Sequence, residues 1–216
     1  MKKLYVVDLD GTLVNANSLH FFISALIKAP LEIKTIYSFY MIFKVILFVV
    51  LRKIRLCSHD RMKQEFQKIW HDFEIRGYKP VFEELTEQYL DKVVRKDVLN
   101  FIANDRSRDD LVLLATAAPS EYVEIMVMLL PIIDKYVATP RINEGEWYHN
   151  IAENKWDSII RAVDIKDTEI ISFTDHADDL PLIKNSHRAY LFLPLSNDIA
   201  SLQKQYKNVV FMKFYE

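Results

Sequence analysis

The sequence has few of the residues that build covalently linked or strongly charged proteins. Cys57 is the single cysteine among 216 residues, so an intrachain disulfide and a cysteine-based metal site are excluded. The net charge is only −2, and the Lys and Arg residues are scattered along the chain. A broad electrostatic attraction to nucleic acid is therefore excluded, and we expect no nucleic-acid partner. Low-complexity segments and flexible linkers are also absent.

The chain also lacks an apolar run of the roughly 20 residues that cross a bilayer. The strongest candidate, residues 36–51, contains Lys44 and is followed by the basic residues Arg52, Lys53 and Arg55. Three interpretations stay open: a helix packed in a helical subdomain, an interfacial helix resting on a membrane, and, less favoured, a spanning helix. The first residues do not resemble a secretion signal, since four apolar residues are followed by Asp8. We expect a cytoplasmic protein, with peripheral membrane contact through residues 36–51 as an alternative.

What is present is the composition and rhythm of a globular α/β protein. Hydrophobic residues make up 50% of the chain and charged residues 27%. Short apolar segments rich in β-branched residues predict strands, and amphipathic helical segments separate most of them. This alternation predicts a Rossmann-like parallel sheet core with helices on both faces. The predicted strands are residues 3–7, 111–115, 135–139, 169–173 and 189–193, with 209–214 as a last edge strand.

Residues 15–96 differ from the rest, because their periodicity is helical and they contain no strand pattern. We interpret them as an inserted α-helical cap, and residues 1–14 and 97–216 as the catalytic core. Breaks between cap helices are expected near Ala29-Pro30 and at residues 77–80, where Gly77 and Pro80 stand.

Polar residues gather where the predicted strands end, which is the edge of a parallel sheet where ligands bind. Asp8 and Asp10 follow the first strand, and Gly11 allows the sharp turn that keeps both carboxylates near one point. The next predicted strand ends at Thr116, whose hydroxyl and following N–H groups, at a helix N-terminus, suit a phosphoryl group. A simple helix N-cap is the alternative interpretation of Thr116.

Two further elements complete the pattern. Lys155 lies near the start of the predicted helix 152–163, where a solvated lysine is the alternative. Asp175, Asp178 and Asp179 follow the strand 169–173, and three carboxylates so close together are costly unless a cation or a lysine compensates them.

Together these residues resemble the haloacid dehalogenase-like superfamily of phosphatases. Asp8-x-Asp10-Gly-Thr matches the first family motif, Thr116 the second, Lys155 the third, and Asp175-x-x-x-Asp179 the fourth. The predicted cap lies between the first and second motifs, as in the phosphoserine phosphatase-like branch. The resemblance extends over essentially the whole chain.

The resemblance implies a magnesium-dependent phosphatase that hydrolyses a small-molecule phosphate monoester through an aspartyl-phosphate. Asp8 would be the nucleophile and Asp10 the general acid and base. Thr116 and Lys155 would hold the transferring oxygens, with Gly11, Thr12 and Ala117 as further phosphate contacts. Mg²⁺ would bind the Asp8 carboxylate, the Asp10 backbone carbonyl and Asp175, and Asp179 would orient a metal-bound water or Lys155.

Substrate identity is left open by these motifs. Asn17 stands where phosphoserine phosphatases carry an acidic residue, so phosphoserine is disfavoured. The apolar cap resembles that of phosphatidylglycerophosphate phosphatases, which makes a lipid phosphate the leading specific hypothesis. A phosphotransferase with the same intermediate and a non-catalytic binding protein are the alternatives. The sequence does not indicate an oligomeric state.

Overall fold

The computed structural model describes residues 2–143 and 145–214. Residues 1, 144, 215 and 216, which belong to the predicted catalytic core, lie outside this description. Its centre is a six-stranded sheet with the order β3-β2-β1-β4-β5-β6. Every neighbouring pair of strands is parallel, so the predicted parallel sheet is confirmed. The strands are β1 (Lys2–Val7), β2 (Leu111–Pro119), β3 (Lys135–Thr139), β4 (Thr168–Thr174), β5 (Arg188–Leu191) and β6 (Val210–Lys213).

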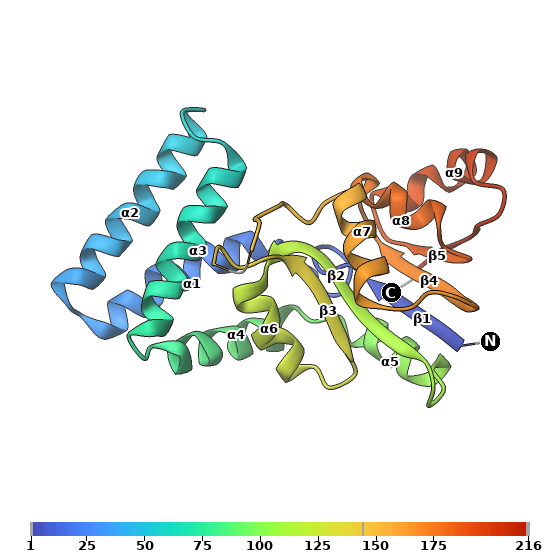
Figure 1. Ribbon diagram of the computed structural model, residues 1–216, viewed down its shortest axis with the longest axis horizontal. Helices are drawn as coiled ribbons and strands as arrows, with labels where there is room; N and C mark the ends of the chain where they lie inside the picture. The colour runs from blue at the N-terminus through green and yellow to red at the C-terminus, as the bar shows by residue number, and fades with distance from the viewer. Residues whose placement is uncertain (1, 144, 215–216) are drawn as a thin grey trace.

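Helices cover both faces of this sheet, as predicted (Figure 1). Side chains alternate along β1, so Tyr5 and Val7 face one layer while Leu4 and Val6 face the other. The first layer contains α5 (Lys96–Asp105) and α6 (Ser120–Leu129). The second contains α7 (Glu153–Ala162), α8 (Leu180–Lys184) and α9 (Ile199–Gln205), with the short 3-10 helices Ala177–Asp179 and Leu195–Asp198. Because β1 is central and pairs with β2 and β4, its end opens into the middle of the sheet edge.

Four helices between β1 and α5 stand off one end of the sheet (Figure 1). They are α1 (Ser18–Ile33), α2 (Ile36–Lys53), α3 (His59–Ile75) and α4 (Lys79–Val93). Trp70 of α3 stacks on Phe82 of α4 and also packs against Phe22 of α1, so the helices share an aromatic core. This core is continuous with one face of the sheet. None of the helices in the described ranges combines the length and apolar character needed to cross a bilayer.

The chain enters and leaves the four-helix segment side by side. Asn15 N–H donates to the Val93 carbonyl at 2.8 Å, and Arg95 N–H donates to the Leu13 carbonyl at 2.9 Å. These bonds lie close to the ends of the predicted cap, residues 15–96. They support the division into cap and core, which stays a prediction.

One predicted helix break is wrong. Helix α1 continues through Pro30 to Ile33 and ends at Lys34, which has a left-handed φ of 56° and donates its N–H to the Pro30 carbonyl. Proline removes one helical hydrogen bond, but the Pro30 ring is buried with Ala29 in this helix. Tertiary packing therefore outweighs the local preference. The other predicted break is confirmed, since α4 begins at Lys79 with Pro80 in its first turn.

Candidate active site

The loop after β1 is fixed from both sides. Asp8 N–H donates to the Phe173 carbonyl of β4 at 3.0 Å, which anchors the loop to the sheet. Asp10 lies two residues on, and its Oδ1 accepts a 2.7 Å hydrogen bond from Ser18 N–H at the start of α1. Burial raises the pKa of Asp10, and this hydrogen bond from the helix N-terminus opposes the shift. The Asp8 backbone is thus held by the sheet, and the Asp10 carboxylate is held by the start of α1.

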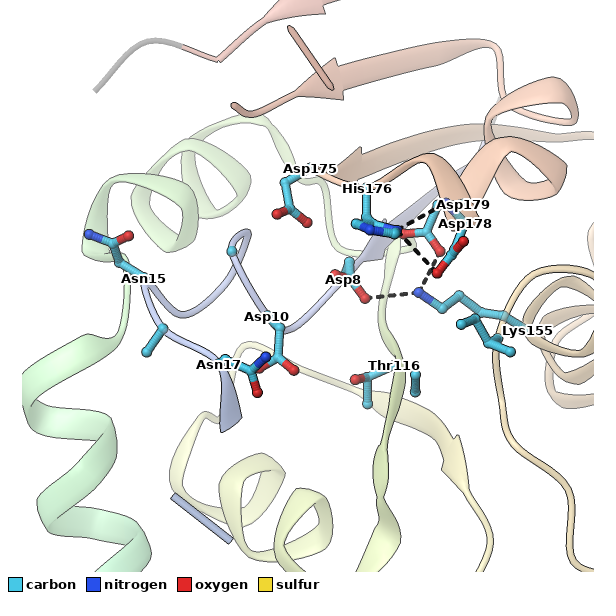
Figure 2. A pocket seen from close by; sticks show the side chains of 14 residues that line it. Asp8, Asp10, Asn15, Asn17, Thr116, Lys155, Asp175, His176, Asp178 and Asp179 are labelled. Atoms are coloured by element: carbon cyan, nitrogen blue, oxygen red, sulfur yellow. Dashed lines mark hydrogen bonds and ion pairs between the residues drawn. The ribbon is translucent and has the colours of Figure 1, made fainter. Parts of the chain in front are cut away.

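Lys155 lies between two carboxylates (Figure 2). Its Nζ is 2.9 Å from Asp8 Oδ1 and 2.5 Å from Asp179 Oδ1. Burial alone would lower the pKa of Lys155, but the charges of Asp8 and Asp179 outweigh it and raise that pKa above its ordinary value. Burial raises the pKa of the Asp8 carboxyl, although Lys155 opposes that shift. Since one ammonium faces two buried carboxylates, the group has an excess of negative charge.

The Asp179 carboxylate is held on its other side as well. The Thr174 hydroxyl donates a 2.6 Å hydrogen bond to Asp179 Oδ2. Thr174 comes directly before Asp175 in the chain, and its hydroxyl supplies this contact within the site. Asp179 is therefore fixed beside Lys155.

Gly11 and Asp175 approach each other closely. Gly11 has a φ of 72°, and a β-carbon built on it would overlap Oδ2 of Asp175. Only glycine fits both this backbone conformation and this space. Burial raises the pKa of Asp175, and the charges of Asp179 and Asp10 add to the shift. The Gly11 backbone of the first motif thus lies directly against the Asp175 carboxylate of the fourth motif.

Thr116 lies in the same site, but its predicted position at a helix N-terminus is wrong. Strand β2 continues through Thr116 to Pro119, and α6 begins only at Ser120. The pairing of β2 with β3 shifts register between Ala115 and Pro119, and the Thr116 hydroxyl accepts a 3.0 Å bond from Ala118 N–H. Its N-cap alternative is also wrong, since no helix starts beside it. Thr116 therefore reaches the cavity from an irregular strand end and not from a helix end (Figure 2).

These side chains share one cavity of about 460 Å³, a size suited to a small ligand. Every predicted site residue except Thr12 lines it. Thr12 is fully buried, so the structure does not bring its hydroxyl to the cavity. The lining residues are mostly polar: Asp8, Asp10, Gly11, Asn15, Ala16, Asn17, Thr116, Ala117, Ile151, Lys155, Asp175, His176, Asp178 and Asp179.

The donor set of this cavity fits a hard divalent cation. Five aspartates line it against a single lysine, and oxygen donors are the ligands that Mg²⁺ prefers. Within residues 2–143 and 145–214, no three His, Cys, Asp or Glu side chains gather as a ready metal site. The predicted set has only two carboxylates, Asp8 and Asp175, and completes its protein ligands with the Asp10 carbonyl.

Sequence reasoning missed a lysine of the helical segment that contacts a residue lining this site. Lys63 of α3 is buried, and its Nζ donates to the Ala117 carbonyl at 3.0 Å and lies 2.8 Å from His149 Nε2. His149 Nδ1 lies 3.2 Å from Asp60 Oδ1. Burial lowers the pKa of Lys63 to about 8, although Asp10 and Asp60 oppose the shift. Lys63 and Gln67 are both buried and one helical turn apart in α3, a pattern that could have marked the stripe facing the core.

Asn150 was missed as well. Its Nδ2 donates to the Thr116 carbonyl at 2.9 Å, and its backbone N–H donates to Thr139 Oγ1 at 3.2 Å. The segment before α7 therefore holds the end of β2 in place. No family motif or local pattern in the sequence marks this residue.

Comparison with known proteins identifies the family. The family model of haloacid dehalogenase-like hydrolases matches residues 5–184, which include all four motifs. The chain belongs to the haloacid dehalogenase-like hydrolases. No curated protein matches the sequence.

Solved structures share the fold of this haloacid dehalogenase-like hydrolase at low sequence identity. A Bordetella pertussis Tohama I protein of unknown function is 15% identical with a TM-score of 0.70, and the alignment covers 97% of this chain and 98% of that one. A probable phosphoserine phosphatase from Vibrio cholerae is 12% identical with a TM-score of 0.63, covering 97% of this chain and 60% of that one. A phosphoserine phosphohydrolase-like protein from Francisella tularensis subsp. tularensis SCHU S4 is 16% identical with a TM-score of 0.54, covering 97% and 95%. The hydrolase therefore has the fold of phosphoserine phosphatase-like structures.

Proposed function

We propose that this hydrolase is a magnesium-dependent phosphatase that cleaves a phosphate monoester through an aspartyl-phosphate on Asp8. The observation that carries the proposal is the position of Asp8, which is buried at the cavity with Lys155 at 2.9 Å. Burial favours the protonated form of Asp8, and the adjacent Lys155 opposes this and favours the ionised carboxylate, which can attack phosphorus directly. Thr116 and Asp175 line the same cavity from the ends of β2 and β4, the two strands that flank β1.

The proposed reaction has two displacements. An Asp8 carboxylate oxygen attacks phosphorus, the bond from phosphorus to the ester oxygen breaks, and Asp10 gives its proton to the departing alkoxide. Asp10 then takes a proton from a water molecule, whose oxygen attacks phosphorus and displaces the Asp8 carboxylate. The products are the alcohol and inorganic phosphate, and both aspartates return to their initial states.

Charge stabilisation comes from groups around the transferring phosphoryl oxygens. Lys155 Nζ and the Thr116 hydroxyl would contact these oxygens, and Asp179 keeps the lysine in position. Mg²⁺ held by Asp8, the Asp10 carbonyl and Asp175 would offset the remaining negative charge of phosphate and carboxylates. Gly11 and Ala117 would supply backbone contacts.

The proposal is tested by phosphate release from sugar, amino acid, nucleotide and lipid monoesters, with Mg²⁺ and with EDTA. We expect turnover only with Mg²⁺, and a loss on the order of 10³-fold or more in Asp8→Asn. Rapid acid quench followed by peptide mass spectrometry should find a phosphate on the peptide that contains Asp8. Turnover that survives in Asp8→Asn would contradict the proposal. Added acceptor alcohols report phosphotransfer, since a phosphotransferase would yield a new phosphate ester.

The narrower proposal is that the substrate is a hydrophobic or lipid phosphate. It rests on the exposed apolar side chains of α2, the observation that favours a protein working beside lipid. The polar cavity would receive only the phosphate and its head group. A matched pair of substrates tests this, one head-group phosphate with acyl chains and one without. Equal kcat/KM for both would contradict it while leaving the phosphatase proposal intact.

A further inference from the structure

Helix α2 carries an uncovered apolar face. Its inner side, with Ser38, Met41 and Val45, is buried against α1 and α3. The opposite side chains are solvent-exposed, and Phe43, near the middle of the helix, is 62% exposed. In Figure 1, α2 lies at the end of the molecule away from the sheet. The outer face of α2 consists of Ile36, Phe39, Tyr40, Phe43, Ile46, Leu47, Val50 and Ile54.

The spacing of these residues shows that they form one stripe and not scattered exposures. Phe39, Phe43, Ile46 and Val50 follow one another at intervals of four, three and four, which keeps them on one side of a helix. Exposed aromatic and branched side chains in such a continuous stripe are rare on soluble proteins that have no partner there. We therefore expect a partner to cover this stripe.

The charge around the outer face indicates which occupant fits. Residues 33–59 contain five Lys and Arg and no Asp or Glu, whereas the whole chain has a net charge of −2. Lys34 stands before the helix, and Arg52, Lys53 and Arg55 lie at its end; all four are exposed. The stripe is thus bordered at both ends by cations.

We propose that the outer face of α2 docks on an anionic lipid bilayer. The helix would lie in the plane of the interface, with the aromatic and aliphatic side chains in the acyl boundary and the basic ends at the phosphate headgroups.

A second copy of the chain fits the outer face less well. Two copies related by a twofold axis would bring the same stripe and the same five cations together, with no acidic residue between residues 33 and 59 to compensate them. An anionic surface supplies the missing charge. This inference shares one observation with the lipid-phosphate proposal, the exposed side chains of α2. It concerns membrane docking through that face and not the catalytic cavity, so either one can fail without the other.

The test is co-sedimentation of the full chain with neutral phosphatidylcholine vesicles and with vesicles that also contain phosphatidylglycerol. We expect binding to the anionic vesicles that weakens as salt rises. Phe43→Glu should reduce this binding about tenfold or more, because it puts a charge in the apolar stripe. Ile75→Glu is the matched control, since Ile75 is exposed on α3 and lies outside the outer face; its binding should equal that of the parent.

A second variant tests the basic border. Arg52→Gln/Lys53→Gln/Arg55→Gln should also lose about tenfold or more of anionic-vesicle binding. Each variant is assayed on a soluble phosphate monoester, where rates equal to the parent show an intact fold and separate docking from catalysis. Three results would overturn the inference: equal binding to neutral and anionic vesicles, no vesicle binding, or a dimer in solution that Phe43→Glu dissociates without any effect on vesicle binding.

Discussion

The α-carbon of Gly11 faces the Asp175 carboxylate so closely that no side chain fits between them. This contact joins the loop after the central strand β1 to the loop after its neighbour β4. Both loops are expected to supply Mg²⁺ ligands, so their separation decides whether a cation fits.

Gly11→Ala should therefore disturb the Mg²⁺ site in addition to straining the backbone. The left-handed φ costs a non-glycine residue about 1–2 kcal/mol, and displacement of Asp175 should come in addition. We expect at least a tenfold rise in the Mg²⁺ concentration that gives half-maximal activity.

Gly77→Ala is the matched control for this variant. Gly77 has a φ of 85° and open space around its α-carbon, so alanine there brings the strain without the overlap. Similar losses of unfolding free energy in urea, with altered Mg²⁺ dependence only in Gly11→Ala, are the expected result. Unchanged Mg²⁺ dependence in Gly11→Ala would show that the contact does not matter for the cation.

The ion pairs of Lys155 provide the second prediction, in which a second substitution restores unfolding free energy but not activity. Lys155→Met leaves Asp8 and Asp179 facing each other without the ammonium, and loss of one partner of a buried ion pair costs about 3–5 kcal/mol. Adding Asp179→Asn removes one of the two stranded carboxylates. The double variant should recover part of the unfolding free energy and none of the activity. If it is as unstable as Lys155→Met alone, the excess negative charge is not the cause.

Local patterns in the sequence predicted the sheet, the order of its strands along the chain and the loops that carry the site. These features depend on short apolar segments and on neighbouring residues such as Asp8 and Gly11. The break at Pro30 was wrong, because burial of that ring in α1 opposes the local preference. Thr116 was placed at a helix end, because a register shift between β2 and β3 leaves no mark in either strand's own sequence.

Contacts between residues far apart in the sequence could not be predicted either, because they leave no mark in the local sequence. Lys63 and Ala117 are 54 residues apart in the sequence and meet only in the folded chain, where the Lys63 side chain reaches the end of β2. A single lysine on a helix is usually solvated, so nothing local marks this one as buried.

Lys63 provides the third prediction. Lys63→Met removes the donor to the Ala117 carbonyl and the neighbour of His149 Nε2, which should cost about 1–3 kcal/mol of unfolding free energy. Because Ala117 lines the cavity, kcat/KM should also fall. Lys68→Met is the control, since Lys68 lies on the same helix with an exposed side chain. Equal behaviour of the two variants in urea unfolding and in phosphate release would refute a special role for Lys63.

Glu121 provides the fourth prediction, on pH. This carboxyl is 1% exposed in α6 and accepts a 2.9 Å hydrogen bond from Gln67, while burial raises its pKa to about 7. A raised carboxyl pKa means that the folded state binds the proton more tightly than the unfolded chain, whose pKa is about 4.3. The resulting stabilisation is complete below pH 4.3 and is lost as pH rises through about 7.

Glu121→Gln keeps an acceptor for Gln67 without the titration, so its advantage in unfolding free energy over the parent should grow as pH rises from 4.3 to about 7. Each unit of pKa shift corresponds to about 1.4 kcal/mol, so a difference on the order of 2 kcal/mol is expected. Urea unfolding of both proteins at pH 5 and pH 8 measures this difference. A constant difference between Glu121→Gln and the parent at the two pH values would mean that Glu121 titrates alike in the folded and unfolded chains.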